Sequence, residues 1–260
     1  MVARLAAKLT AAALAVAVTV AGHVAAALAQ AVMDLQLVLA VDVSGSVSDE
    51  RFKLQQQGYS QAFRDWRVLD AIRSGNAQAI AVTMTQWTGP GQQAQVVPWM
   101  IITDETSILA LADAIERTTR QLYGGGTSIS GAIDHAVTLF ADEGGGGDAS
   151  KGAGKGAFKG GRLVIDVSGD GANNRGRPAA EARDEAVAKG ITINGLPILA
   201  LEPGLDQYYQ SNVIGGPNAF MVVAESYENF AEAVVRKLIT EIAARNAKGK
   251  TAMEGKRRVQ

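Results

Sequence analysis

Apolar residues along this chain fall into short continuous runs and into longer stretches with helical spacing. The short runs lack the alternation of polar and apolar residues, which is typical of strands buried on both faces of a sheet. We expect strands at 35–43, 78–87, 95–102, 162–167, 191–199 and 219–224. Helical stretches lie between most of these runs. The pattern predicts an α/β fold with a doubly wound, mainly parallel sheet and helices on both faces.

The stretches with helical spacing predict helices over 106–121 and 178–189, and three more that begin after Ser48, near Thr127 and after Ser226. Ser48 and Ser226 are suitable caps, because a hydroxyl oxygen can accept a hydrogen bond from the first turn of a helix. Each helix carries apolar residues that we expect to face the sheet.

Three apolar stripes define the part of the predicted core that helices supply. They comprise Phe52, Tyr59, Phe63 and Trp66, then Ile129, Ile133, Val137 and Phe140, and finally Phe230, Val234, Val235, Leu238 and Ile242. His135 lies roughly 150° around its helix from the second stripe, at 100° per residue. We therefore expect His135 to face solvent, with a catalytic role as the alternative.

One pair of strands is expected to be antiparallel. The turn Gly89-Pro90-Gly91 lies between the runs at 78–87 and 95–102, and this spacing is short enough for a hairpin. Pro98 has no N–H to donate, which suits a strand at the edge of a sheet. The fold should therefore include one antiparallel edge strand.

Residues 1–29 have the pattern of a secretory signal peptide. Arg4 and Lys8 precede an uncharged apolar run at 9–22, and Ala27-Leu28-Ala29 provides a cleavage site. An uncleaved anchor is the alternative, but a run rich in alanine is a weak membrane span. We expect a cleaved leader and a periplasmic or secreted mature protein with no membrane span.

The remaining chain is predicted to form one domain over residues 30–245. Residues 144–161 include nine glycines and should form a flexible loop inside this domain, because strands are predicted on both sides. The loop lysines, Lys151, Lys155 and Lys159, are expected to be solvated. Residues 246–260 form a basic tail without periodicity, which we expect to be disordered.

Composition excludes several classes of function. The chain has no cysteine, which rules out disulfide frameworks, thiolate zinc sites, iron–sulfur clusters and cysteine nucleophiles. Only two histidines are present, so a histidine-rich catalytic metal site is not expected. Residues 30–245 carry 18 basic and 25 acidic side chains, a net charge of −7. This acidic body argues against electrostatic binding to nucleic acid.

Side chains with hard oxygen ligands follow two predicted strands and one run of glycines, at the carboxyl edge of the predicted sheet. Asp42, Ser44 and Ser46 follow the first strand, Thr127 follows a run of glycines, and Asp170 follows the strand at 162–167. Open α/β sheets bind ligands at this edge, beside a topological switch point. Hydroxyl and carboxylate oxygens suit Mg²⁺, Mn²⁺ or Ca²⁺. We predict one divalent ion here; the alternative is that these side chains only cap turns.

The order Asp42-x-Ser44-x-Ser46, then Thr127, then Asp170-Gly171 resembles the metal-ion-dependent adhesion site of von Willebrand factor type A domains. The chain also resembles a family of secreted bacterial proteins that contain a domain of unknown function of this type. The stretches that carry the closer resemblance are LVLAVDVSGSV, GGTSISGA, VIDVSGDGANN, GITINGLPI, VIGGPNAF and FAEAVVRKLITEIA.

The resemblance implies a role for each site residue. Ser44 and Ser46 would bind the ion directly, Thr127 directly or through water, and Asp42 and Asp170 mostly through water. Two carboxylates neutralise a divalent ion, while neutral hydroxyls beside it leave it electrophilic. An open coordination position could then accept a carboxylate from a partner.

We therefore expect an exported, metal-dependent adhesion or scaffold module that binds a protein ligand presenting Glu or Asp. The alternatives are a metal-dependent hydrolase and a structural envelope protein with an empty site. We expect no enzyme, because the sequence has no G-x-S-x-G motif and no evident base beside the site. The glycine-rich loop also fails the P-loop pattern, since Ala149 and Gly156 replace its required Gly and Ser or Thr.

Overall fold

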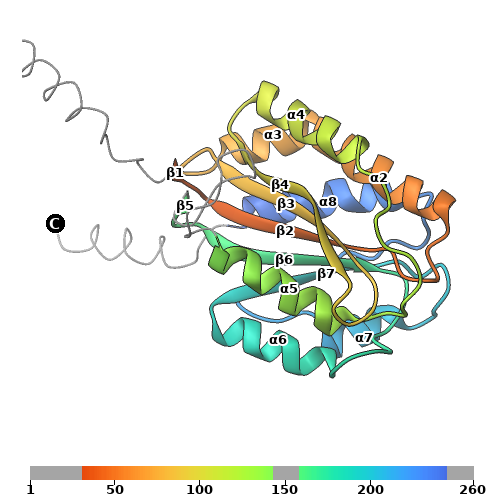
Figure 1. The fold of residues 1–260 in the computed structure, drawn as a ribbon. Coiled ribbons are helices and arrows are strands. Elements are labelled where there is room, and N and C mark those ends of the chain that lie inside the picture. Colours follow the sequence, from red (N-terminus) through yellow and green to blue (C-terminus); the bar gives the residue numbers. More distant parts are fainter. Residues whose placement is uncertain (1–30, 143–157, 245–260) are drawn as a thin grey trace, which may run out of the picture. The chain divides into compact units, whose positions relative to one another are not determined.

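The computed structural model describes residues 31–142 and 158–244 of the chain. The predicted leader at 1–29, most of the predicted loop at 144–161 and the predicted tail at 246–260 lie outside the described residues. The main sheet has five strands in the order β4-β3-β2-β6-β7 (Figure 1). These strands are β2 (Leu35–Asp42), β3 (Ile80–Trp87), β4 (Gln93–Ile102), β6 (Arg162–Gly169) and β7 (Ile191–Pro197).

The predicted fold class is confirmed. Strands β2, β3, β6 and β7 are parallel, while β4 pairs with β3 in the antiparallel direction at the edge of the sheet. Pro98 lies in this edge strand, as expected, and the β3–β4 pairing shifts register near Met84. The central position of β2 explains why all eight of its residues are buried.

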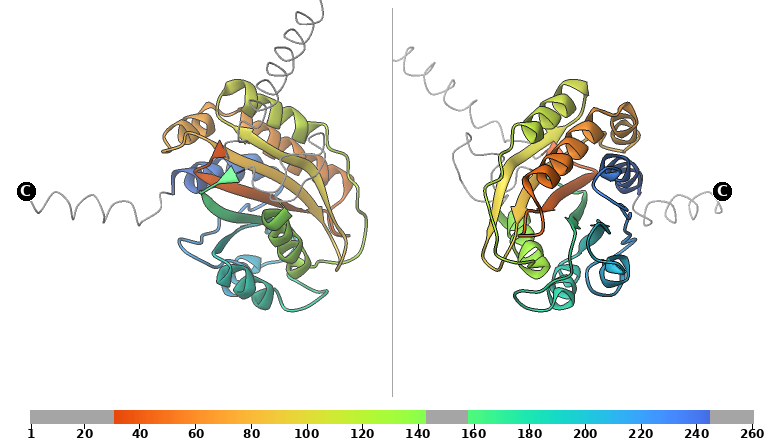
Figure 2. Two further views of the ribbon diagram at one scale, coloured as in Figure 1. Left: turned by 60° about the vertical axis from the view of Figure 1, so that its left-hand side comes forward. Right: turned by 90° about the vertical axis from the view of Figure 1, so that its right-hand side faces the viewer.

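Helices cover both faces of the sheet (Figures 1 and 2). One face packs against α2 (Asp49–Arg64), α3 (Trp66–Arg73), α4 (Glu105–Glu116) and α8 (Phe230–Ala243). The other face packs against α5 (Ile129–Asp142), α6 (Ala179–Ala188) and α7 (Leu205–Asn212). Of the helices in the described ranges, none has both the length and the hydropathy that a bilayer span requires.

The pleat of β2 divides the hydrophobic core into two layers. Leu35, Leu37 and Leu39 point towards the layer that contains α2, α3, α4 and α8. Val38 and Ala40 point towards the layer that contains α5, α6 and α7. Successive strand residues face opposite sides, so a continuous apolar strand supplies both layers.

The prediction that Trp66 belongs to the core stripe is wrong. Phe52, Tyr59 and Phe63 are buried, but Trp66 is 70% exposed. Helix α2 ends at Arg64, and Asp65 caps the start of the separate helix α3. Because the chain breaks at Asp65, the spacing that places Phe63 in the core does not continue to Trp66.

Several predicted elements differ in extent. The helix expected at 106–121 ends at Glu116. The strand expected at 219–224 is absent from the described sheet, and isolated bridges at Met221 and Ala224 take its place. Helix α8 begins at Phe230 after Asn229, so Ser226 does not cap it; its hydroxyl instead accepts the N–H of Glu228 in the preceding turn. Helix α7 was not predicted.

The glycine-rich loop ends earlier than predicted. Residues Phe158–Lys159 form strand β5, which pairs in parallel with β1 (Ala31–Val32). Phe158 is buried and packs edge-on against Trp99, with the ring centroids 5.7 Å apart. The assignment of 158–159 to a flexible loop is therefore wrong, whereas Lys159 is exposed as predicted.

Candidate metal site

The predicted site lies at a topological switch point of the sheet. Neighbouring strands β2 and β6 end at the same edge, where Val41 is in register with Ser168. The chain leaving β2 enters α2 on one face, and the chain leaving β6 enters α6 on the other. The carboxyl ends of the two strands therefore bring Asp42 and Asp170 to one place.

Hydrogen bonds fix the shape of the loop that follows β2. One oxygen of Asp42, Oδ1, accepts the backbone N–H of Ser44 at 2.7 Å. The Oγ atoms of Ser44 and Ser46 lie 3.2 Å apart, so both hydroxyls point to the same side. The guanidinium of Arg51 donates to the carbonyl of Ser46 at 2.7 Å, and that of Arg120 donates to the carbonyl of Ser44 at 3.2 Å.

Asp170 joins this loop to the strand end of β6. The hydroxyl of Ser46 donates to Oδ1 of Asp170 at 2.5 Å, and the hydroxyl of Tyr227 donates to its Oδ2 at 2.7 Å. The guanidinium of Arg51 lies 3.9 Å from the same Oδ2. Asp170 therefore connects residues that are more than 100 positions apart in the sequence.

The site concentrates negative charge in a buried place. Asp42 is fully buried and Asp170 is 1% exposed. Burial, followed by the charge of Asp170, raises the pKa of Asp42 to about 7, although the N–H of Ser44 favours the ionised form. Oδ2 of Asp42 has no hydrogen-bond partner among the described residues. A bound cation would relieve both the repulsion between the carboxylates and the cost of burying them.

Thr127 reaches the same edge from the loop before α5. Its N–H donates to the side-chain oxygen of Asn174, and its carbonyl accepts the N–H groups of Asn174 and Arg175. A Cβ placed on Gly171 would lie 3.7 Å from the hydroxyl oxygen of Thr127. Thr127 is therefore held beside the chain that follows Asp170.

The structure brings the five predicted ligands to one edge of the sheet. Hydrogen bonds connect Asp42, Ser44, Ser46 and Asp170 to one another. The backbone carbonyl of Thr127 accepts hydrogen bonds from the loop that follows Asp170. Within the described ranges, no three histidine, aspartate or glutamate residues cluster as a conventional metal site. Two carboxylates and three hydroxyls nevertheless fit a hard divalent ion, which prefers oxygen ligands.

Three residues near the site escaped the sequence analysis. The hydroxyl of Tyr227 bonds Asp170, and Tyr209 of α7 lies close to Asp42. Glu202 accepts the N–H of Ala172, two residues after Asp170. Their contacts depend on tertiary folding, and no local motif in the sequence marks any of them.

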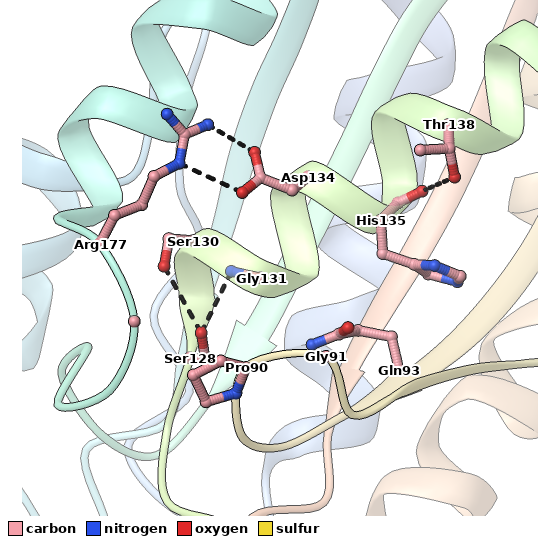
Figure 3. A pocket seen from close by; sticks show the side chains of 11 residues that line it. Pro90, Gly91, Gln93, Ser128, Ser130, Gly131, Asp134, His135, Thr138 and Arg177 are labelled. Atoms are coloured by element: carbon pink, nitrogen blue, oxygen red, sulfur yellow. Dashed lines mark hydrogen bonds and ion pairs between the residues drawn. The ribbon is translucent and has the colours of Figure 1, made fainter.

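A separate pocket of about 370 Å³ lies beside the first turns of α5 (Figure 3). His135 lines this pocket and is half-buried, so the expectation that it faces solvent is wrong. The helical wheel could not show that the β3–β4 turn passes along this side of α5, where Pro90, Gly91 and Gln93 line the same pocket as His135. Arg177, on the opposite wall, is paired with Asp134 and Glu185.

The mainly parallel sheet with one antiparallel edge strand, flanked by two helical layers, is the fold of a von Willebrand factor type A-like domain. The chain belongs to the family described as protein of unknown function DUF1194, whose sequence profile matches residues 31–246. No curated protein matches the chain.

Solved structures share the fold at low sequence identity. Proximal thread matrix protein 1 from the mussel byssus is 14% identical over 82% of this chain, with a TM-score of 0.56. A further structure of that protein, with a zinc-occupied MIDAS motif, has a TM-score of 0.52 at 12% identity, over 82% of this chain and 49% of that chain. This chain spans about half the length of the mussel protein, 48% in the first of these structures.

Two bacterial proteins have the same fold. The von Willebrand factor type A protein from Catenulispora acidiphila is 17% identical, with a TM-score of 0.51, over 81% of this chain and 42% of its own. The pilus adhesin SpaC from Lactobacillus rhamnosus GG is 15% identical, with a TM-score of 0.54, over 81% of this chain and 30% of its own.

Proposed function

We propose that this domain is a metal-dependent protein-binding module that serves in adhesion or as a scaffold. It holds one divalent ion, Mg²⁺, Mn²⁺ or Ca²⁺, and binds a partner through a Glu or Asp side chain that completes the coordination of that ion. The proposed ligands are Asp42, Ser44, Ser46, Thr127 and Asp170. The observation that carries the proposal is the pair of buried carboxylates at the switch point, one bonded by the backbone N–H of Ser44 and the other by the hydroxyl of Ser46.

The surroundings of the loop suit an ion that keeps one position open. Asp42, Ser44 and Asp170 are buried, but Ser46 is half-buried and Gly45 is exposed, so the outer side of the loop is accessible. Neutral hydroxyls leave more positive charge on the ion than a shell of carboxylates would. The net charge of −7 over residues 30–245 would otherwise repel an acidic partner, so partner binding should require the ion.

The likeness to known structures supports this proposal at the level of the fold. The mussel byssus protein has been seen with a zinc-occupied MIDAS motif, and SpaC is a pilus adhesin. We propose a binding role without catalysis for this chain. We also propose that residues 1–29 direct export and that cleavage follows Ala29, which mass spectrometry of the protein from a periplasmic or culture fraction would test.

Calorimetric titration of the purified domain with Mn²⁺ and Mg²⁺ tests the ion. We expect one binding event in the wild type and none in Asp42→Asn, which keeps the shape of the side chain but removes its charge. Asp206→Asn, a matched change on helix α7, should bind like the wild type. A wild-type domain that takes up neither ion would contradict the proposal.

Affinity capture from cell-envelope extract tests the partner. A partner should bind the wild type in Mg²⁺ and be released by EDTA, and Ser46→Ala should weaken capture because it removes one proposed ligand without changing the net charge. Ser74→Ala is the matched control, since Ser74 follows α3 and precedes β3, away from the carboxyl edge of the sheet. If the wild type in EDTA and the Ser46→Ala variant both capture the partner as well as the wild type does in Mg²⁺, the partner binds another surface of the domain.

A further inference from the structure

The two buried carboxylates of the site have a common arrangement. One oxygen of each bonds a serine of the loop after β2: Oδ1 of Asp42 accepts from the N–H of Ser44, and Oδ1 of Asp170 accepts from the hydroxyl of Ser46. The second oxygen of each, Oδ2, has no hydrogen bond to those serines among the described residues. A tyrosine hydroxyl lies near each of these second oxygens.

Tyr227 provides the hydroxyl beside Asp170. It precedes α8, is 4% exposed, and donates to Oδ2 of Asp170 at 2.7 Å. The guanidinium of Arg51 lies over the ring, 5.4 Å from its centroid. Together these contacts hold the carboxylate of Asp170 in one orientation.

Tyr209 reaches Asp42 across two glycines. A Cβ on Gly195 of β7 would lie 2.7 Å from the ring of Tyr209, and a Cβ on Gly169 of β6 would lie 3.0 Å from its hydroxyl oxygen. The same Cβ on Gly169 would lie 2.9 Å from Oδ2 of Asp42. The space left by these two missing side chains therefore admits the ring and brings its hydroxyl towards Asp42.

The oxygens of Tyr209 and Asp42 are complementary. Both atoms are buried, and neither has a hydrogen-bond partner among the described residues. A buried hydroxyl and a buried carboxylate oxygen that border the same space are each costly alone and favourable together. Burial and the charges of Asp42 and Asp170 raise the pKa of Tyr209, so the phenol keeps the proton that it would donate.

We propose that Tyr209 and Tyr227 are positioning residues of the metal site. The hydroxyl of Tyr227 already holds Oδ2 of Asp170. The hydroxyl of Tyr209, which has no partner among the described residues, would donate to Oδ2 of Asp42 when the site takes up its ion, so that the remaining carboxylate oxygens stay directed towards that ion. This inference rests on the proposed function and assigns part of it to α7 and to the turn before α8. Removing a group that orients a metal ligand typically weakens ion binding by about 10- to 100-fold.

Titration of Mn²⁺ into Tyr209→Phe and Tyr227→Phe tests the inference, with Tyr59→Phe as the matched control. Tyr59 is also a buried tyrosine whose hydroxyl has no hydrogen-bond partner in the described ranges, but it lies on α2 and its ring packs edge-on against Phe230 of α8. We expect the dissociation constant for Mn²⁺ to rise at least about tenfold in each of the first two variants. It should be unchanged in Tyr59→Phe.

Thermal unfolding in EDTA separates positioning from simple packing. Tyr209→Phe removes a hydroxyl without a partner, so the ion-free domain should be as stable as the wild type or more stable, while ion binding is weakened. A purely structural role would not give these opposite effects. Wild-type affinity for Mn²⁺ in both phenylalanine variants would overturn the inference and leave the proposed function intact. Absence of Mn²⁺ binding in the wild type would instead remove the proposed function itself.

Discussion

The absence of a Cβ atom at Gly169 leaves the space in which Tyr209 approaches Asp42. Gly169 ends β6 between Asp42 and Tyr209, and its backbone has no positive φ angle, so its role is to leave space. Any larger residue there would push the carboxylate and the phenol apart. The glycine is therefore required by contact with side chains and not by the conformation of the turn.

We expect Gly169→Ala to destabilise the domain by about 1–3 kcal/mol, the usual cost of overpacking a filled interior. It should also weaken Mn²⁺ binding, because Asp42 must move. Thermal unfolding and calorimetry measure the two effects. Gly45→Ala is the control for stability, since its Cβ would meet no atom closer than 4.0 Å; equal melting temperatures for both variants would refute the packing argument.

Two tryptophans should differ sharply in their contribution to stability. Trp87 ends β3 and is fully buried, so Trp87→Ala should cost about 3–5 kcal/mol. Trp66 is 70% exposed, and Trp66→Ala should stay within about 0.5 kcal/mol of the wild type. Urea denaturation followed by circular dichroism measures both, and a large loss for Trp66→Ala would mean that this side chain packs against something.

At the scale of elements, α8 is anchored by buried charges as well as by its apolar face. Lys237 pairs with Asp166 of β6, and the two side chains are 1% and 2% exposed. Glu241 accepts a hydrogen bond from Arg162 at 2.6 Å and another from the amide of Asn194. These contacts fix the helix on β6 and β7, and the turn before it supplies Tyr227.

Lys237→Met should destabilise the domain by about 3–5 kcal/mol, because it leaves the charge of Asp166 buried without its partner. Adding Asp166→Asn should recover much of the loss. Arg236→Met provides the comparison. Within the described ranges the side chain of Arg236 pairs only with Glu232, and both are exposed, so the change should alter stability by less than about 1 kcal/mol. If urea denaturation shows similar losses for both single variants, the buried pair has no special role in docking α8.

Local patterns were sufficient for the elements that position the proposed ligands. The continuous apolar runs that became β2 and β6 predicted both strand ends, and with them the places of Asp42 and Asp170. The pattern failed where tertiary contacts decide. Residues 219–224 are apolar enough for a strand, but they form only single bridges, to Gly195 of β7 and to Ile198 just after it.

The residues that support the site could not be predicted for the same reason. Tyr209 lies near Asp42 only because Gly169 and Gly195 are folded beneath it, across three strands. The spacing of residues along the chain therefore could not predict that Tyr209 lies near Asp42. The sequence indicated a short list of oxygen ligands, while the groups that orient them became visible only in the folded domain.

At the scale of the whole domain, the site and the two positions that flank the glycine-rich insertion, the end of α5 and the start of β5, lie at opposite ends of the sheet (Figure 1). The site is at the carboxyl ends of β2 and β6. Strand β5 follows the insertion and pairs with β1, just before the amino end of β2. Phe158 closes this end of the core against Trp99.

Replacing residues 144–156 with a short Gly-Ser linker should leave the melting temperature within a few degrees, because the entropy of closing a loop changes slowly with its length. Phe158 must be kept. Phe158→Ala should lower stability by about 3–5 kcal/mol, since it empties a packed position. A linker variant that fails to fold would show that the excised residues form a packed element.

The end of the sheet beside the β1–β5 pair is suitable for attaching the domain to a surface. The insertion leaves α5 after Asp142 and returns at Phe158, and both positions belong to the end of the sheet remote from Asp42 (Figure 1). A biotin-acceptor peptide placed between them would attach the molecule to a sensor surface from behind, with every copy presenting the same edge to the solution. Because the strands of a parallel sheet all point the same way, attachment at one end leaves the carboxyl edge, with the candidate metal site, facing the solution. Partners could then be screened without covering that edge.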